Sequence, residues 1–375
     1  MINLYYTVML TAVLVPALLI LSVALWNVVA WPKIKPSFLT RAHAVSVLIP
    51  ARNEESNIAA CLDSVLNQGE TVSEILVYDD HSDDATPRII HEYRGRDARV
   101  RPVAPSALPR GWCGKNFACA QLAKEATGDW LLFLDADARL ARAAVTSMVE
   151  EAIARDLTML SGWPALSLAS FWERALMPML NFVVFTLFPA PLSLVRDDES
   201  LGLVHGACIL VDRSSYYAIG GHSAVRDEIF EDQRLARLWR AKGMRGLCLD
   251  GQGIVSVRMY RSLGEIWAGF QKNFFPAFRH EASFWGFILL HLLVLLAPLV
   301  ALAFTRRWLV MAAAACALAA RALLAIRFRH PLWGVLLHPA AEVILIAIGL
   351  SSWWRVKSGR GVLWKGRLYH AAAKQ

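Results

Sequence analysis

The chain has 375 residues, of which 56% are hydrophobic and 19% charged, and its mean hydropathy is +0.40. It is too apolar for an ordinary soluble protein and too charged for a bundle made only of membrane spans, so soluble and membrane-embedded parts are expected in one chain. The net charge is +8, and the tail after Trp354 carries six Lys or Arg and no acidic residue. A basic run beside apolar segments is typical of contact with anionic lipid headgroups, and no nucleic-acid motif is present.

The six cysteines are scattered, without a CxxC pair or a metal-ligand spacing, and Cys316 lies inside a hydrophobic segment. This usage indicates reduced cysteines that pack as small apolar groups. It predicts a folded part that faces a reducing cytosol.

The amino-terminal segment, residues 4–31, carries no charge and is long enough to cross a bilayer about 30 Å thick. A cleaved signal peptide would need a positive region before the apolar run, and here Lys33, Lys35 and Arg41 follow it instead. We therefore expect residues 1–32 to be an uncleaved anchor in a bacterial-type cytoplasmic membrane. Because basic residues favour the cytoplasmic side, the amino terminus is expected outside and the next domain in the cytoplasm.

From residue 45 onward, short β-rich runs alternate with helical spacings. The expected strands are VSVLIP, EILVYDD, VRPVAP and DWLLFLDAD, and the expected helices are ARNEESNIAACLDSVLNQ, SDDATPRIIHEYRGR and KNFACAQLAKEA. Ser82 and Asp83 are expected to cap the second helix, with Pro87 in its first turn. This alternation predicts an α/β domain with a mainly parallel sheet and flanking helices.

Three polar clusters stand where expected strands end: 50–54, 79–80 and 135–137. Ligands of parallel sheets bind at the carboxyl ends of strands, so these clusters are expected to meet at one edge. A set of solvated turns is the alternative, but three acidic strand ends on one edge favour a site.

Two apolar stretches are expected at the membrane surface. Residues 178–195 carry no charge, but their three prolines argue against a clean span. We expect them to lie in the interface or line a lipid groove, with a buried core helix as the alternative. Residues 263–280 place large apolar side chains at i, i+3 and i+4, which predicts an amphipathic interface helix, again with a core helix as the alternative.

The carboxyl-terminal part, residues 284–354, contains hydrophobic segments at 284–304, 308–326 and 332–354, which predict two or three spans. Arg321 and Glu342 are expected to pair inside the bundle. Three crossings would leave the basic tail, 355–375, outside, against the charge rule, so we expect a cytoplasmic tail and one segment that does not cross.

The stretches VSVLIPARNEE, ILVYDDHSDDAT, GWCGKNFACAQ, FLDADA and EDQRLA, in this order, resemble the membrane-bound family 2 glycosyltransferases. A closer resemblance, through LPRGWCGKNFACAQLA, RMYRS and WKGRLY, is to the carotenoid- and hopanoid-associated members. The resemblance covers about residues 44–280. It implies a GT-A fold, Rossmann-like, with a cytoplasmic catalytic domain over 44–262 and transmembrane helices at both ends.

Asp135 and Asp137 alternate at a strand end. Mg²⁺ prefers oxygen ligands and commonly takes one or two carboxylates together with substrate phosphates. In the resembled family the last aspartate of this motif binds the metal and the first reaches the ribose or the metal. The resemblance therefore implies a divalent cofactor, Mg²⁺ or Mn²⁺, at these two residues.

The resemblance also implies a nucleotide pocket made by Pro50, Arg52, Glu54, Asp79 and Asp80, with one of the two aspartates bonded to the base. Glu54 as a cap of its own helix is the alternative. The family often has glycine at the position of His81.

Lys115 matches a family lysine near the donor. Since a lysine at a helix start is unfavourable beside the dipole, it is expected to have an anionic partner such as diphosphate. Arg258 and Arg261 lie where processive relatives and ceramide glucosyltransferases carry an arginine followed by tryptophan, but Ser262 replaces that tryptophan. The arginines could clamp the diphosphate or bind lipid phosphates.

Asp232 is the expected catalytic base, because the family places its base at the second acidic residue of this motif; Glu231 is the rival. Both carboxylates could otherwise serve only as favourable charges at a helix start.

The sequence thus predicts an inverting glycosyltransferase that moves one sugar from a nucleotide-diphosphate sugar, with UDP-glucose expected, to a lipid acceptor such as a carotenoid or other isoprenoid. The alternatives are a ceramide- or polyprenyl-phosphate-type enzyme, a polysaccharide synthase, and an inactive lipid-binding scaffold. The acidic set Asp79, Asp135, Asp137 and Asp232 argues against the scaffold, since buried charges without a use are costly.

Overall fold

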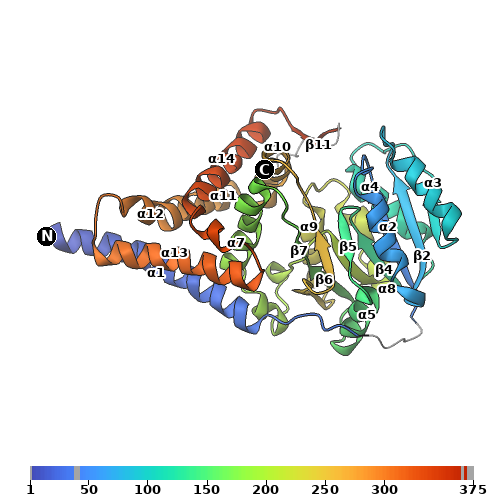
Figure 1. Cartoon of the computed structure of the whole chain (residues 1–375), viewed down its shortest axis with the longest axis horizontal. Helices are drawn as coiled ribbons and strands as arrows, with labels where there is room; N and C mark the ends of the chain where they lie inside the picture. Colours follow the sequence, from blue (N-terminus) through green and yellow to red (C-terminus); the bar gives the residue numbers. More distant parts are fainter. Residues whose placement is uncertain (1, 38–42, 365–366, 370–375) are drawn as a thin grey trace. The chain divides into compact units, whose positions relative to one another are not determined.

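The computed structural model of the chain describes residues 2–37, 43–364 and 367–369. It divides into two compact units that each draw on separate parts of the sequence. The sheet unit comprises Pro32–Ser167 and Leu192–Met259, and the helical unit comprises Met1–Trp31, Leu168–Pro191 and Tyr260–Gln375 (Figure 1). The predicted catalytic range, 44–262, is therefore interrupted by a segment that belongs to the helices.

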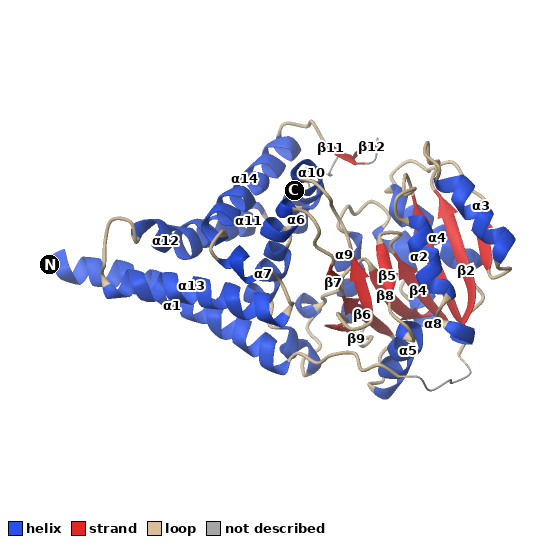
Figure 2. Cartoon of the chain, viewed as in Figure 1, coloured by secondary structure: helices blue, strands red, loops and turns tan. Residues whose placement is uncertain are grey.

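The sheet unit is built on seven strands in the order β3-β2-β1-β4-β8-β6-β9 (Figure 2). All neighbours pair in parallel except β8, which is antiparallel to both β4 and β6. This is the mainly parallel, Rossmann-like sheet that the βα alternation predicts. The strands are β1 Val45–Ala51, β2 Val72–Asp79, β3 Val100–Val103, β4 Trp130–Leu134, β6 Met159–Trp163, β8 Cys208–Asp212 and β9 Gly246–Asp250.

Helices cover both faces of this sheet, which explains why its strands read as continuous apolar runs. In β1, Val47 packs into a core with helices α2 and α5, and the next residue, Leu48, packs into a second core with α4 and α9. The helices of this unit are α2 Ile58–Leu66, α3 Thr86–Arg96, α4 Gly114–Glu125, α5 Ala144–Ala154, α8 Arg213–Ala218 and α9 Glu231–Ala241.

A small second sheet in this unit has the order β5-β10-β7. Its strands are β5 Ala138–Leu140, β7 Ala165–Leu166 and β10 Val255–Val257. Because β5 follows the Asp135–Asp137 turn directly, this sheet anchors the far side of that turn.

The helical unit has eight α-helical segments, a π-helical stretch at His291–Leu296 and a terminal hairpin in the part of the chain that the structure describes. The helices are α1 Ile2–Ala30, α6 Phe171–Leu176, α7 Pro178–Leu187, α10 Leu263–Asn273, α11 Glu281–Leu290, α12 Ala297–Ala301, α13 Trp308–Arg327 and α14 His338–Lys357, and the hairpin strands are β11 Val362–Trp364 and β12 Arg367–Tyr369. Short 3₁₀ turns in the two units lie at Gly69–Thr71, Ala190–Leu194, Glu199–Leu201, Gly221–Val225, Phe275–Ala277 and Leu332–Val335.

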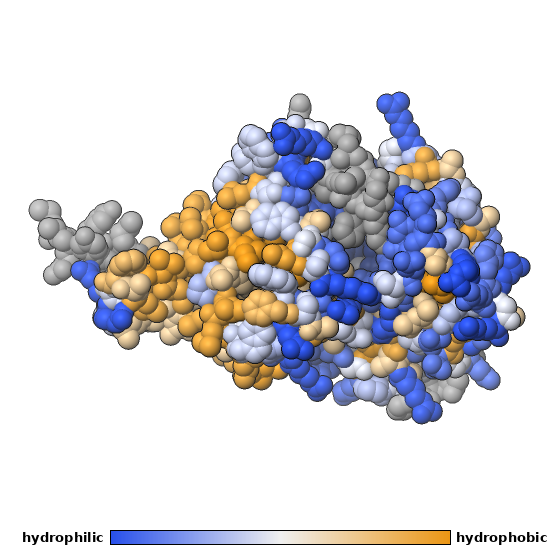
Figure 3. Space-filling view, turned by 45° about the horizontal axis from the view of Figure 1, so that its top comes forward, coloured by the Kyte–Doolittle hydropathy of each residue, from blue (hydrophilic) through white to orange (hydrophobic). Residues whose placement is uncertain are grey.

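Three helical stretches among the described residues are long and apolar enough to cross a membrane: Thr11–Ala30, Glu281–Ala301 and Trp308–Arg327. Their large apolar side chains face outward at positions such as Leu19, Val29 and Val300, and hydrophobic colour gathers on this unit in Figure 3. The predicted segment 332–354 is not among these candidates. It begins with a 3₁₀ turn, and α14 carries His338 and Glu342 in its first turns.

Two of the expected apolar helices differ from their predictions: one is shorter, and the other is buried. The helix predicted over 263–280 ends at Asn273, because Pro276 has no N–H and its ring clashes with the backbone four residues earlier. In the 178–195 segment, α7 ends at Leu187 and buries Phe182 and Phe185 completely. The described helix is therefore a packed core element, which was the alternative to an interface position.

The buried amide of Asn27, near the end of the first candidate span, fixes the end of α7. Its Nδ2 donates to the carbonyl oxygens of Phe185 and Phe188, both at 2.8 Å. Its Oδ1 accepts from the N–H of Ala190, also at 2.8 Å. The amide thus uses every hydrogen-bonding group it has toward the chain that follows α7.

Arg321 and Glu342, which were expected to pair, make no direct ion pair among the described residues, although the charge of Glu342 acts on the Arg321 guanidinium. Glu342 is fully buried and contacts His291 Nδ1 at 2.8 Å and His338 Nε2 at 3.5 Å. Arg321 is also buried, with its guanidinium carbon 6.0 Å from the ring centre of Phe182. The carboxylate is therefore held by two imidazoles, while the guanidinium packs on an aromatic ring.

Candidate active site

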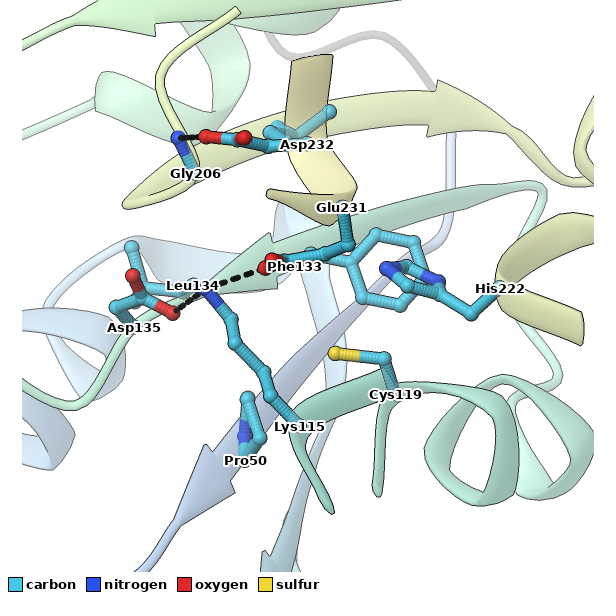
Figure 4. Close-up of a pocket in the computed structure, with 11 residues that line it drawn as sticks. Pro50, Lys115, Cys119, Phe133, Leu134, Asp135, Gly206, His222, Glu231 and Asp232 are labelled. Atoms are coloured by element: carbon cyan, nitrogen blue, oxygen red, sulfur yellow. Dashed lines mark hydrogen bonds and ion pairs between the residues drawn. The ribbon is translucent and has the colours of Figure 1, made fainter. Parts of the chain in front are cut away.

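The candidate active site lies at the edge of the sheet where β1 and β4 end and β8 begins. Strand pairing places Cys208, the first residue of β8, opposite Leu134, the last of β4. As a result the N–H of Asp135 donates to the carbonyl of Ala207 at 3.1 Å. The pocket at this point is lined by Pro50, Lys115, Cys119, Phe133, Leu134, Asp135, Gly206, Ile209, His222, Glu231 and Asp232 (Figure 4).

Lys115 joins two carboxylates across this pocket. Its Nζ lies 2.8 Å from Oδ1 of Asp135 and 3.1 Å from Oε1 of Glu231 (Figure 4). Burial alone would lower the pKa of Lys115, but the charges of Asp135 and Glu231 raise that pKa well above its ordinary value. The ammonium is therefore a fixed positive charge, with the anionic partners that its place at the start of α4 predicts.

Asp232 stands in the first turn of α9, with its carboxylate held by two backbone groups. Oδ2 accepts from the N–H of Gly206 at 3.0 Å, and Oδ1 accepts from the N–H of Gln233 at 2.7 Å. Burial, and after it the charge of Glu231, raises the pKa of Asp232 to about 7, against the opposing effect of Lys115. A carboxylate with a pKa near the working pH is suited to accept a proton.

Gly206 is required where the loop before β8 passes this carboxylate. A Cβ at that position would lie 2.9 Å from Oδ2 of Asp232 and 3.4 Å from Nζ of Lys115. Only glycine lets the backbone N–H approach the carboxylate so closely.

The floor of the pocket is closed by neutral groups. Burial raises the pKa of the Cys119 thiol and lowers the pKa of His222 to about 4. Nδ1 of His222 lies 2.9 Å from the hydroxyl of Tyr216. The charges that face the pocket are therefore those of Lys115 and its acidic neighbours.

Asp135 and Asp137 flank the turn between β4 and β5. The N–H of Ala138 donates to the carbonyl of Asp135 at 3.0 Å, and the N–H of Arg258 donates to the carbonyl of Asp137 at 3.4 Å. Among the described residues, no group of three His, Cys, Asp or Glu could hold a metal ion by itself. One or two carboxylates completed by substrate phosphates is the usual way in which Mg²⁺ is bound, so the residues present fit such a metal.

The predicted nucleotide residues lie in the last residues of β1 and β2 and on the loops that follow these strands. Arg52 donates to the carbonyls of Asp80, at 2.5 Å, and of His81, at 3.3 Å, so it fastens one loop to the other. Asp79 accepts from the Ser82 hydroxyl at 2.5 Å. His81 has φ +55°, a conformation that glycine adopts without strain, which accounts for the glycine that the resembled family often has there.

Two predictions concerned residues that cap helices α2 and α3. The helix expected to open at Ser82 and Asp83 begins at Thr86, whose N–H donates to Asp84 Oδ1 at 2.9 Å. Glu54 accepts from the side chain of Asn57 at 2.7 Å, just before α2. This bond does not reach a backbone N–H of the helix, so the capping alternative for Glu54 stays a prediction.

The structure thus gathers Pro50, Lys115, Asp135, Glu231 and Asp232 in one pocket. Arg52 and Glu54 follow β1, Asp79 is the last residue of β2, and Asp80 comes directly after it. Arg258 adjoins the Asp137 turn through its backbone. Arg261 belongs to the helical unit, where its N–H donates to Glu265 Oε2 at 2.9 Å.

Sequence reasoning missed His205, Gly206 and His222. The available signal was the stretch VHGACILVD, an apolar strand preceded by a histidine and a glycine. It gave no reason to place this strand beside the Asp135 turn, because that requires an antiparallel strand inserted into an otherwise parallel sheet.

Residues 46–220 match the family model for glycosyl transferase family 2. The chain is 29% identical over 232 residues to the 4,4'-diaponeurosporenoate glycosyltransferase of Staphylococcus aureus (strain USA300), covering 60% of each chain. It is 29% identical over 221 residues to the protein of that name from Staphylococcus haemolyticus (strain JCSC1435), covering 58% of this chain and 57% of the relative. The matched region thus spans less than two thirds of these relatives' own length.

Among solved structures, a mannosyltransferase from Pyrobaculum calidifontis in complex with GDP-Man and Mn²⁺ is similar, with a TM-score of 0.57 and 20% identity. The similarity covers 92% of this chain and 97% of that one. It confirms the predicted GT-A fold.

Proposed function

The chain carries a family 2 glycosyltransferase domain, and from this premise we propose that it transfers one sugar from a nucleoside-diphosphate sugar to a membrane lipid, with inversion at the anomeric carbon. The observation that carries the proposal is the arrangement of Asp232 beside Gly206, next to carboxylates that Lys115 joins. It puts a proton acceptor and a fixed cation in one pocket.

For a hydroxyl acceptor, Asp232 takes the proton as the acceptor oxygen bonds to the anomeric carbon. The bond from that carbon to the diphosphate breaks, and its electron pair leaves with the nucleoside diphosphate. Attack from the side opposite the leaving group inverts the anomeric configuration. Lys115, at the start of α4, can meet the negative charge that grows on the diphosphate.

A divalent ion, Mg²⁺ or Mn²⁺, would be held by Asp137 and Asp135 together with the diphosphate, and it would stabilise the departing charge as a Lewis acid. The chain holds these two aspartates in place before any metal ion binds. The turn that carries both aspartates is fixed by the bonds of Ala207, Ala138 and Arg258 to its backbone.

The nucleotide is expected on the loops after β1 and β2, where Arg52 keeps the two loops together beside Pro50, Glu54, Asp79 and Asp80. UDP-glucose is the donor we would test first. Arg258 and Arg261 are further candidates for diphosphate binding.

The acceptor is expected to come from the membrane. The three apolar helices and the name of the staphylococcal relatives support an isoprenoid such as a carotenoid. If its acceptor group is a carboxylic acid, that group is already ionised and Asp232 is less important as a base. We propose an integral protein of a bacterial-type cytoplasmic membrane, with the sheet unit facing the cytoplasm, because Lys33 and Lys35 follow the first candidate span.

A ceramide- or polyprenyl-phosphate-type transferase is the second candidate, since it would use the same donor site with another lipid. A secreting polysaccharide synthase is less well supported. Ser262 stands where processive relatives have tryptophan, and the described carboxyl-terminal part supplies two candidate spans.

The test is release of nucleoside diphosphate from UDP-glucose by the purified full chain, with Mg²⁺ or Mn²⁺, with and without membrane lipid extract. Metal-dependent release that lipid increases, and that Asp137→Ala and Asp232→Asn lose, is expected. Absence of metal-dependent binding of any sugar in a panel of nucleotide sugars would contradict the proposal.

A further inference from the structure

Asn116 is a buried polar residue next to Lys115 that the mechanism above does not use. It lies in the first turn of α4, and only 1% of the residue is exposed. Its Nδ2 donates to three backbone carbonyls of one short loop, those of Val225 at 2.7 Å, Arg226 at 3.3 Å and Glu228 at 2.9 Å. Because three acceptors surround this end of the amide, its NH₂ group must point there. The amide thus holds the 225–228 loop against the start of α4.

The 225–228 loop is closed on itself and tied to α4 a second time. The N–H of Glu228 donates to the carbonyl of Val225 at 3.1 Å. The N–H of Cys113, the residue just before α4, donates to the carbonyl of Arg226 at 2.7 Å. The loop is therefore a compact turn that one side chain and one backbone N–H connect to the start of α4.

The same loop leads into α9, the helix that carries the proposed base. Oε2 of Glu228 lies 3.5 Å from Nε of Arg234 in α9, so an ion pair links the loop to the helix in addition to the chain itself. Phe230, which directly precedes α9, has no side-chain group that can cap the helix. The start of α9, and Asp232 with it, therefore depends on the loop for its position on this side.

Lys115 also connects α4 with α9, but its contact is exposed to competition during the reaction. In the proposed transfer the ammonium meets the charge of the diphosphate, so its 3.1 Å contact with Glu231 must be shared or given up. The bonds of Asn116 join a neutral amide to backbone carbonyls, and no step of the transfer competes for them. They can hold α4 and the start of α9 at a constant distance throughout turnover.

We propose that Asn116 is a positioning residue: by holding the 225–228 loop, it sets the place of Asp232 relative to the donor that Lys115 meets. This inference rests on the proposed function. It assigns to the amide an effect on the rate of transfer and none on donor binding, because the three bonds of its side chain go to the loop. A catalytic group displaced by about 1 Å can cost about a hundredfold in rate.

The test compares three variants of the full chain in lipid nanodiscs, with UDP-glucose, Mn²⁺ and a membrane lipid extract. Asn116→Ala removes the amide, and Asn116→Asp keeps its shape but turns a carboxylate oxygen toward the three carbonyls. The third variant keeps Asn116 and lengthens the loop by one glycine after the exposed Asp227. It separates the carbonyls that the amide gathers without touching the buried side chain.

We expect kcat per folded molecule to fall between about tenfold and a hundredfold in all three variants. The donor Kd, measured by calorimetry, should stay within about twofold of the wild type, since the lost interaction is not one with the donor. The matched control is Asn27→Ala, which removes an equally buried amide that also donates to two backbone carbonyls, but in the helical unit. It should lower Tm and leave kcat per folded molecule unchanged.

A kcat within about threefold of the wild type, in the lengthened loop or in either Asn116 variant that folds, would overturn the inference. So would an equal loss of kcat and donor affinity, which indicates a general disturbance of the pocket, or the same loss of kcat in Asn27→Ala. Metal-dependent transfer by the wild type alongside any of these results would leave the proposed function standing. A wild type that binds no nucleotide sugar would remove the proposed function first, and the inference with it.

Discussion

The two units of this protein bury ionisable side chains in different ways. In the sheet unit, Lys115, Asp135 and Glu231 line a pocket and remain partly exposed, with side-chain exposures of 38%, 29% and 12%. In the helical unit, His291, His338 and Glu342 are fully enclosed. Charges that keep access to solvent can exchange partners with a substrate, while enclosed ones can serve only one another.

We therefore expect the first group to act in the reaction and the second group to stabilise the helical unit. Substitutions in the pocket should therefore change turnover more than folding. Substitutions in the enclosed cluster should do the reverse.

The largest effect is expected for Asp232→Asn. With a hydroxyl lipid as acceptor, loss of the base should reduce kcat about a thousandfold, since general-base catalysis contributes roughly 10²–10⁴. Steady-state kinetics and donor binding by calorimetry check this, with donor affinity expected to remain. Asp227→Asn, at an exposed position in the preceding loop, is the matched control. A loss below fivefold would argue against Asp232 as the base.

Lys115→Met should lower turnover about a hundredfold, as the loss of one preorganised charge does. In the absence of donor the same variant should bind Mn²⁺ more tightly, because the ammonium 2.8 Å from Asp135 no longer competes for that carboxylate. Electron paramagnetic resonance of free Mn²⁺ measures this. Lys124→Met, exposed on the same helix, is the control. Weaker Mn²⁺ binding in Lys115→Met would show that the Lys115 ammonium and Mn²⁺ do not compete for the Asp135 carboxylate.

Glu342→Ala should destabilise the helical unit by about 3 kcal/mol, because removing one partner of a buried pair leaves the other without compensation. Thermal unfolding in detergent should show a lower Tm, with kcat per folded molecule close to that of the wild type. Glu125→Gln, at an exposed site, provides the baseline. Unchanged stability with a lost activity would break the comparison and give the enclosed cluster a direct part in the reaction.

The smallest effect is a pH dependence. With a pKa of about 7, Asp232 is mostly protonated at pH 6 and mostly ionised at pH 8. With a hydroxyl acceptor, kcat/KM should therefore rise about tenfold over that interval and then level off. The raised pKa also means that this group's contribution to stability falls as pH rises from about 4 to 7. A rise that persists in Asp232→Asn would assign the titration to another group.

The parallel core and its acidic edge could be predicted from sequence because each rests on a local pattern. The run LLFL before Asp135 is apolar throughout since both faces of β4 are covered, and the polar clusters follow the strands directly. The position of His205 could not be predicted, because it depends on β8 entering between β4 and β6. The partners of Glu342 could not be predicted either, since His291 lies on another helix, 51 residues away.

Two other details that were predicted wrongly, the end of α10 and the cap of α3, could have been inferred from the sequence. Pro276 marks the end of α10, and Asp84, two residues before Thr86, is as good a capping residue as Ser82 or Asp83. Several adjacent polar residues can each cap a helix, so composition alone does not select among them.

The bonds of Asn27 have a consequence for synthesis of the chain. Its partner Phe185 comes 158 residues later, and ribosomes add about 5–20 residues per second. The first hydrophobic helix therefore exists for roughly 8–30 s before the groups that satisfy its amide have been made. During that interval the first segment of the sheet unit, Pro32–Ser167, emerges, and the helical unit is completed last although it is begun first.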